Sequence, residues 1–153
     1  MRLTVARCWQ RDNERPYLCA GPSKSSTKAV WKQAALAETA RSTGVAYGIG
    51  MFDLQKAFER VPWDLLVIAA GECNYNLYLL RLSIAAYALD KSVTTTGACS
   101  KYVRASRGST AGSSFATIEL RVLLPPTMDV LSRTFTLTTF TVYVDDAPTL
   151  GAF

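Results

Sequence analysis

The sequence predicts an α+β domain, a small antiparallel sheet with helices packed on one face. Three observations predict it. Hydrophobic residues make up 49% of the 153 residues, enough to form a core, and charged residues 19%. Two runs rich in β-branched and aromatic residues, 45–52 and 136–144, are separated by segments with helical spacing. No internal repeat is visible, and the order of the segments is that of one α+β domain.

The elements follow from local patterns. Residues 1–27 have mixed polarity, two prolines and a Ser-rich stretch, which predicts extended or loop structure with Thr27 as a helix N-cap. From 28 to 42 the apolar residues recur on one helical face, and Gly44 is a typical helix stop. The strand 45–52 is weakened by Gly48 and Gly50, positions typical of a close approach by another backbone or a ligand.

The middle of the chain predicts a short helical turn at 56–61, closed by Pro62, and then two apolar helices separated by Gly71 and Asn74. Composition favours β structure next, followed by a glycine-bearing loop, a helix that Pro125 and Pro126 should break or kink, and a last strand. The ranges expected are helices at 63–70, 75–89 and 113–124, short strands or a hairpin at 92–96 and 102–105, and a strand at 136–144.

Composition excludes several classes. The longest apolar stretch, 82–89, is too short to cross a bilayer, and the N-terminus lacks the apolar segment of a secretory signal, so we expect an intracellular protein, nuclear or cytoplasmic. The four cysteines are scattered and histidine is absent, which argues against structural zinc. The net charge of +5 is compatible with a polyanionic partner and equally with ordinary solubilising charge.

The chemistry is concentrated where the two β runs end. The first run ends on Asp53, and the second ends on Asp145 and Asp146. An Asp at a strand end is often only a turn former or helix cap. Adjacent carboxylates, however, repel each other unless a cation neutralises them, and carboxylates from converging strands can hold the two divalent ions of a nucleotidyl transfer reaction.

Three motifs then indicate a family. Tyr143-Val144-Asp145-Asp146 resembles the Y/F-x-D-D signature of reverse transcriptases, and the segment 53–62 resembles the D-L-x-K-A-F-D-x-V-P stretch of non-LTR retrotransposon and group II intron enzymes. The loop 107–113 is similar to their motif B, although Ala111 stands where the family has Gln. Together the motifs cover 45–148 in the family's order. The resemblance implies an N-terminal segment or partial fingers at 1–44 and a palm at 45–153, with the thumb absent.

Roles follow from this resemblance position by position. Asp53, Asp145 and Asp146 would be catalytic and, with Leu54, would bind two Mg²⁺ ions or Mn²⁺. Leu54, Lys56, Ala57, Phe58, Gly112 and Ser113 would contact the incoming nucleotide and base pair, with Phe58 as the ring that rejects a 2′-hydroxyl; ordinary core packing is the alternative for Phe58. The implied partners are an RNA template, a DNA primer and a dNTP, with no membrane, and the oligomeric state stays open. The rival interpretation is an inactive retroelement remnant that binds nucleic acid weakly.

Overall fold

The structure is a computed structural model that describes residues 1–21, 24–110, 112–144 and 146–152. The chain divides into two compact units, each described here by itself. The helical unit comprises residues 1–6 and 56–123, and the sheet unit comprises residues 7–55 and 124–153. The mixture of helices with a small antiparallel sheet confirms the α+β class.

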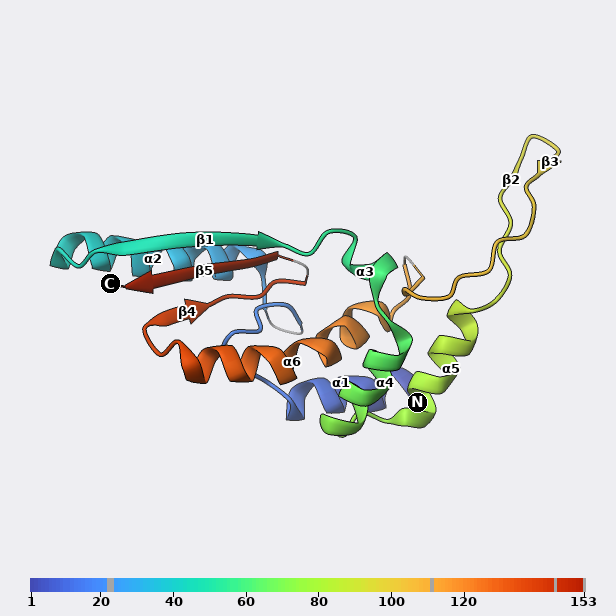
Figure 1. Cartoon of the computed structure of the whole chain (residues 1–153), viewed down its shortest axis with the longest axis horizontal. Coiled ribbons are helices and arrows are strands. Elements are labelled where there is room, and N and C mark those ends of the chain that lie inside the picture. Colours follow the sequence, from blue (N-terminus) through green and yellow to red (C-terminus); the bar gives the residue numbers. More distant parts are fainter. Residues whose placement is uncertain (22–23, 111, 145, 153) are drawn as a thin grey trace. The chain divides into compact units, whose positions relative to one another are not determined.

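The sheet unit is built on three antiparallel strands in the order β1-β5-β4 (Figure 1). Their bounds are Tyr47–Asp53 for β1, Thr138–Phe140 for β4 and Asp146–Ala152 for β5. Seven residue pairs join β1 to β5 without interruption, from Tyr47 opposite Ala152 to Asp53 opposite Asp146. Gly50 serves this pairing, because a Cβ there would lie 3.0 Å from the Thr149 hydroxyl oxygen.

The strand predicted at 136–144, whose end we expected beside the end of 45–52 in one antiparallel sheet, is shorter than predicted and has a different neighbour. Only Thr138–Phe140 pairs with β5, and β5, which the sequence did not predict, lies between it and β1. The β4–β5 pairing ends beside Pro148, which has no N–H to donate. The chain instead bonds to the 17–19 segment, with Val142 N donating to Tyr17 O and Cys19 N donating to Val142 O, both at 2.7 Å.

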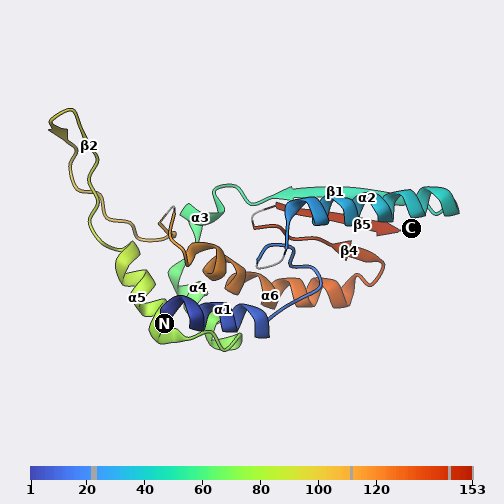
Figure 2. The ribbon, with the colours of Figure 1, turned by 180° about the vertical axis from the view of Figure 1, so that it is seen from behind.

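Helix α2 (Ser26–Thr43) runs along one face of the sheet (Figure 2). Its start differs from the expected one, since the side chain of Ser25, not Thr27, accepts a hydrogen bond from Lys28 N. Its end is as predicted: Gly44 adopts φ 70°, and its N–H bonds back to the last turn. Alternation along 140–143 places Thr141 and Tyr143 in the hollow under α2, whereas Phe140 and Val142 pack toward α6.

Two further expectations about helices are wrong. Residues 2–12 form a helix, α1 (Arg2–Asp12), instead of a loop. Its fully buried positions are only Ala6, Trp9 and Gln10, a narrow stripe containing a polar residue, so the periodic signal in the sequence is weak. Gly71 does not separate helices, because it lies inside α4 (Trp63–Glu72). The helices are separated by residues 73–76, within which Asn74 has φ 53°.

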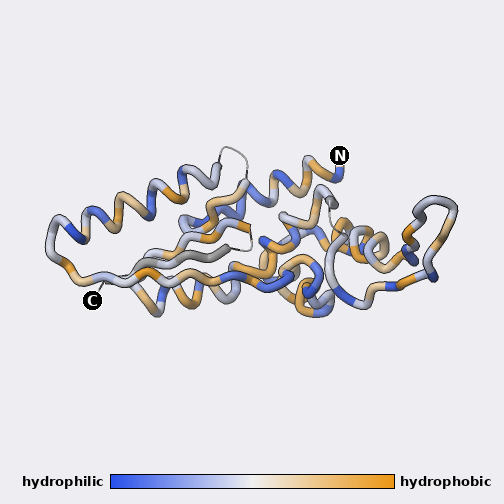
Figure 3. Tube along the Cα trace, turned by 90° about the horizontal axis from the view of Figure 1, so that it is seen from above, coloured by the Kyte–Doolittle hydropathy of each residue, from blue (hydrophilic) through white to orange (hydrophobic). Residues whose placement is uncertain are grey.

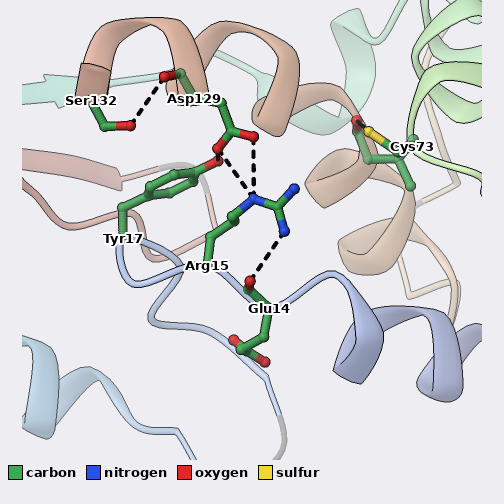
Figure 4. Close-up of polar contacts among 7 residues, drawn as sticks. Glu14, Arg15, Tyr17, Cys73, Asp129 and Ser132 are labelled. Carbon is green, nitrogen blue, oxygen red and sulfur yellow. Dashed lines mark hydrogen bonds and ion pairs between the residues drawn. The ribbon is translucent and has the colours of Figure 1, made fainter. Parts of the chain in front are cut away.

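Of the break or kink predicted at the double proline, the break is wrong, because α6 (Ala116–Thr134) continues through Pro125 and Pro126, and the kink stays a prediction. A helical proline cannot donate to the carbonyl four residues earlier. For Pro126 that carbonyl belongs to Val122, and the Cys73 thiol contacts it at 3.9 Å (Figure 4). A side-chain donor thus partly replaces the missing backbone bond.

In the sheet unit, the C-terminal part of α6 packs on a small core of Tyr17, Leu18, Met128 and Val142. Asp129 fixes the preceding loop to the helix. The Arg15 Nε lies 3.2 Å from both Asp129 carboxylate oxygens, and the Tyr17 hydroxyl donates to one of them at 2.6 Å (Figure 4).

The helical unit contains α3 (Ala57–Arg60), α4, α5 (Leu77–Tyr87), the start of α6 and a hairpin of β2 (Thr94–Thr95) and β3 (Ala98–Cys99) (Figure 1). The two apolar helices predicted at 63–70 and 75–89 are therefore present. Their buried residues, which include Leu66, Ala70, Leu80 and Tyr87, form the core with Ile118 and Val122 of α6. Within the described residues, no helix is long and apolar enough to cross a membrane.

Candidate functional site

Two carboxylate-bearing positions meet at the end of the β1–β5 ladder. Asp53 is the last residue of β1 and Asp146 is the first of β5, and the two form the terminal pair of the register. Directly opposed residues in antiparallel strands have Cα atoms about 4.5–5.5 Å apart. The fold therefore brings together two of the three predicted acidic positions, which are 93 residues apart in the chain (from 53 to 146). The third, Asp145, lies outside the described residues, so its convergence with Asp53 stays a prediction.

The donor chemistry of this strand end fits a divalent cation. Asp53 is exposed, and no side chain in the described part of the chain donates a hydrogen bond to its carboxylate. Opposed like charges destabilise a strand pair, and Mg²⁺ prefers such hard oxygen ligands while retaining several waters. Among the residues described, a set that omits Asp145, no three acidic, Cys or His residues lie close enough together to hold a metal ion.

Strained backbone flanks these carboxylates. Val144 has φ 59°, a left-handed conformation that costs a β-branched residue energy. Lys56, three residues after Asp53, has φ 54° and begins α3 without a side-chain cap. Such outliers persist only where the surroundings impose them, and they cluster at functional sites.

A hollow of about 440 Å³ lies between α2 and the sheet, within the sheet unit. Its lining is mainly apolar and includes Val30, Ala34, Ile49 and Met51. Gln33 and Thr141 also line the hollow, and the Gln33 Nε2 donates to the Thr141 hydroxyl oxygen at 2.5 Å. Nothing in this lining would bind a triphosphate, so the strand end and not the hollow is the candidate site.

The predicted nucleotide-contacting residues fall into different units. Leu54 is exposed and belongs to the sheet unit with Asp53, whereas Lys56, Ala57 and Phe58 belong to the helical unit. Phe58 is half-buried, neither in the core nor fully exposed. Its role as a barrier to the 2′-hydroxyl stays a prediction.

Within the helical unit, Phe58 is tied to the glycine-bearing loop. The Phe58 carbonyl accepts a hydrogen bond from Ser109 N at 2.8 Å, and the Val61 carbonyl accepts one from Gly108 N at 2.8 Å. The Trp63 indole N–H donates to the Gly108 carbonyl at 2.7 Å. Residues 108–110, here named the anchored loop, are therefore fixed through Gly108 and Ser109 to α3 and the start of α4, by two backbone hydrogen bonds and the Trp63 indole.

Gly108 allows this close approach. It has φ 84°, and a Cβ at this position would lie 2.5 Å from the Glu59 carbonyl oxygen. No other residue fits without moving one of the two backbones. The motif resemblance marked this glycine as part of a loop, but it did not reveal the contact with Glu59.

Gly112 and Ser113 do not start the helix as predicted, because α6 begins at Ala116. Gly112 has φ 80° and is exposed, with nothing within 4 Å of a Cβ added there. Ser113 lies in a turn before the helix, where its N–H donates to Thr110 O and its hydroxyl accepts from Phe115 N. Ala111, where the family has Gln, lies outside the described residues.

A buried polar cluster lies behind Ser113. The Tyr87 hydroxyl is 3.0 Å from the Ser113 hydroxyl and donates to Glu119 Oε2 at 2.7 Å. Glu119 is 1% exposed, and burial raises the pKa of its carboxyl, against the opposing influence of Ser83, Tyr87 and Arg2. Burial likewise raises the pKa of the Tyr87 phenol, which stays protonated and able to donate.

Sequence reasoning missed this cluster and the Trp63 contact. Glu119 reads as the polar face of a helix, and only its placement between apolar Ile118 and Leu120 hints at burial. Nothing in the sequence signals that the Trp63 indole reaches residue 108.

Comparison with known proteins agrees at the level of the fold. No protein-family model matches the sequence, and no curated protein matches it. The structure is similar to that of telomerase from Candida albicans in complex with a fragment of telomeric RNA, with a TM-score of 0.63 and 16% identity over 98% of this chain. It is also similar to apo telomerase from Candida tropicalis, truncated from the C-terminal domain, with a TM-score of 0.61 and 12% identity over 98% of the chain.

The fold of this chain is thus similar to that of part of these two telomerases. The chain spans 29% of the length of the Candida albicans telomerase chain and 32% of the length of the Candida tropicalis one. At these identities the similarity establishes the fold alone. It does not distinguish the retrotransposon or intron type that the motifs resemble.

Proposed function

We propose that this chain is the palm core of an RNA-directed DNA polymerase of the non-LTR retrotransposon or group II intron type. It would add deoxynucleotides from dNTPs to a primer 3′-hydroxyl on an RNA template. The observation that carries the proposal is the pairing of Asp53 with Asp146 at the end of one strand ladder. That the similar Candida albicans telomerase is in complex with RNA supports a nucleic-acid partner.

Asp53, Asp145 and Asp146 would hold two Mg²⁺ ions, with Leu54 beside them. The ions supply charge neutralisation at the attacking and leaving oxygens of an in-line phosphoryl transfer. The residues of this chain would position the reactants. The α3 start at Lys56 and Ala57 would face the triphosphate, and the turn at Gly112 and Ser113 would face the base pair. Positioning matters, since misplacement by about 1 Å can cost about 10²-fold in rate.

Metal binding tests the site independently of catalysis. Titration with Mn²⁺, followed by paramagnetic broadening of backbone amides, should affect residues at the β1–β5 end first. Asp53→Asn and Asp145→Asn should each weaken Mn²⁺ binding at least about tenfold, because each removes a charged oxygen ligand. Asp64→Asn, an exposed carboxylate on α4, is the matched control and should leave binding unchanged. Equal broadening in all four proteins would exclude the metal site.

Extension of a DNA primer on an RNA template, with dNTPs and Mg²⁺, tests the reaction. We expect the 153 residues alone to extend poorly, since Ala111 stands where the family's motif B has the Gln amide. Robust extension abolished by Asp145→Asn would show that this core suffices. The inactive-remnant interpretation predicts neither metal binding nor extension, even within a longer chain.

Phe58 provides a specificity test in any active form of the protein. Phe58→Val removes the ring and should relax discrimination against ribonucleotides, because space opens for a 2′-hydroxyl. Leu66→Val, a buried α4 position in the same unit, is the control for general loosening. Unchanged discrimination in Phe58→Val would return Phe58 to a packing role.

A further inference from the structure

The excess of basic over acidic residues is concentrated in one segment. Residues 91–118 contain Lys91, Lys101, Arg104 and Arg107 and no acidic residue. The other 125 residues hold 13 basic and 12 acidic residues, a net charge of only +1. Nearly all the net charge of +5 therefore comes from residues 91–107, here named the basic arm.

The basic arm is a hairpin without a core of its own. Every residue from 91 to 104 is exposed, and the ribbon extends away from α5 within the helical unit (Figures 1 and 2). Thr96 and Gly97, with φ 42° and 83°, form the two-residue turn, and both left-handed conformations match the type of turn that suits tight hairpins. An isolated two-stranded hairpin is only marginally stable in water. No packing requirement therefore accounts for its length.

A bulge presents the charged and aromatic residues of the second strand. Thr94 pairs with Cys99, and Lys91 pairs with Val103, so two residues on the first side oppose three on the second. The three are Ser100, Lys101 and Tyr102. Bulges of this kind redirect side chains, and the Tyr102 side chain is 76% exposed.

Asp90 directly precedes Lys91, whereas the other three cations of the basic arm have no acidic residue near them in the sequence. No ion pair in the described part of the chain involves Lys101, Arg104 or Arg107, and Lys91 bonds instead to the Thr110 hydroxyl at 3.0 Å. Hydrophilic and hydrophobic residues are interleaved along the segment, as the colours of the trace show (Figure 3). Unpaired cations beside an exposed aromatic ring suit a partner that offers both phosphates and stackable bases.

We infer that the basic arm binds single-stranded nucleic acid, with Lys101, Arg104 and Arg107 contacting phosphates and the Tyr102 ring stacking on a base. The inference rests on the proposed function and names a surface where that function would hold its template or primer strand. Lys91 ties this surface to the anchored loop through Thr110.

The test measures binding of a fluorescent single-stranded RNA, about 20 nucleotides long, by anisotropy over about 50 to 200 mM salt. The DNA of the same sequence and the matching duplex are separate arms. EDTA is present, so neither metal nor catalysis contributes. Lys101→Gln with Arg104→Gln should raise Kd at least about tenfold and reduce the salt slope by about 1.4, or about 0.7 per lost phosphate contact.

The matched control is Arg41→Gln with Arg133→Gln, two exposed cations outside the arm. This control has the same net charge as the double variant in the arm. It should change Kd less than about threefold, because salt screens the long-range attraction between distant cations and the nucleic acid. Tyr102→Leu should raise Kd for single strands about tenfold, whereas Tyr102→Phe keeps the ring and should change it less than about twofold. Because these positions are exposed, thermal unfolding should be unchanged in every variant.

If the control double variant raises Kd as much as the double variant in the arm, the inference is wrong. An unchanged Kd in Tyr102→Leu would also overturn it. Binding to anionic lipid vesicles but not to RNA or DNA would assign the arm to a membrane surface instead. Strand binding with no Mn²⁺ binding at the β1–β5 end, and no primer extension even within a longer chain, would leave the arm assignment standing and remove the polymerase proposal. Primer extension that the arm variants leave unchanged would remove the arm assignment and leave the polymerase proposal standing.

Discussion

The basic arm and the anchored loop are consecutive in the chain and are held in opposite ways. The anchored loop is fixed by backbone hydrogen bonds from Gly108 and Ser109, by the Trp63 indole and by a glycine that no other residue can replace. The basic arm has no buried residue from 91 to 104. In this unit, backbone proximity therefore restricts which residues fit the loop, whereas packing places no such restriction on residues 91–104 of the arm.

Gly108→Ala should give the largest effect. The Cβ would meet Glu59 backbone at 2.5 Å, and φ 84° is unfavourable for alanine, so we expect a loss of about 3 kcal/mol or more in the free energy of unfolding. Urea denaturation measures it. Gly44→Ala is the matched control, since Gly44 is also left-handed but has nothing within 4 Å, and it should cost only about 1 kcal/mol. Equal losses would show that proximity to Glu59 is unimportant.

Trp63→Phe should be next in size. It removes the hydrogen bond to the Gly108 carbonyl, and we expect a loss of about 1–3 kcal/mol. Thermal unfolding provides the measurement, with Trp31→Phe, at an exposed position on α2, as control. If both substitutions have the same small effect, the indole bond does not stabilise the loop.

Glu119→Gln should alter the pH dependence of stability. Burial raises the pKa of the Glu119 carboxyl above its ordinary value of 4.5, so the folded state holds the proton more tightly than the unfolded state. The stabilisation is full below that value and is lost as pH rises through the raised pKa. The Tm of Glu119→Gln minus the Tm of the unmodified protein should therefore increase as pH rises from about 4 to 7. A constant difference in Tm would mean that Arg2 and its neighbours fully compensate the buried charge.

Gly97→Ala should have the smallest effect on global stability, below about 0.5 kcal/mol. It strains the turn of the arm by about 1–2 kcal/mol locally, but the arm can open without exposing any core. Amide hydrogen exchange at Ser100 and Val103 should accelerate while the urea midpoint stays in place. A global loss comparable to that of Gly108→Ala would show that the arm supports the unit after all.

How much of this could be predicted depended on how local each signal was. The strand ending on Asp53 and the left-handed stop at Gly44 were predictable because composition and turn chemistry act over a few residues. The strand β5 was not, since Asp146–Ala152 contains a proline and small residues and is strand only through its pairing. The continuous helix through Pro125 and Pro126 likewise depends on contacts that are distant in sequence, including Cys73.

The acidic positions of the candidate site could be predicted from the sequence, but the contacts that hold the neighbouring loop and helices could not. The motifs located Asp53 and Asp146, and the structure pairs their positions. The contacts of Trp63, Glu59 and Tyr87 involve partners more than 25 residues away, and no spacing in the sequence encodes them.

The uninterrupted β1–β5 ladder makes this strand end sensitive to chain length more than to residue identity. Its seven pairs contain no bulge that could absorb an extra or missing residue. Deleting one residue between Pro148 and Ala152 would slide the start of β5 by one position, setting Asp146 opposite Phe52 and moving that position to the other face of the sheet. Many substitutions in this stretch would preserve the pairing, whereas a single-codon deletion would undo it. In related sequences, in-frame length changes here would therefore mark the chains that have lost the pairing of Asp53 with Asp146.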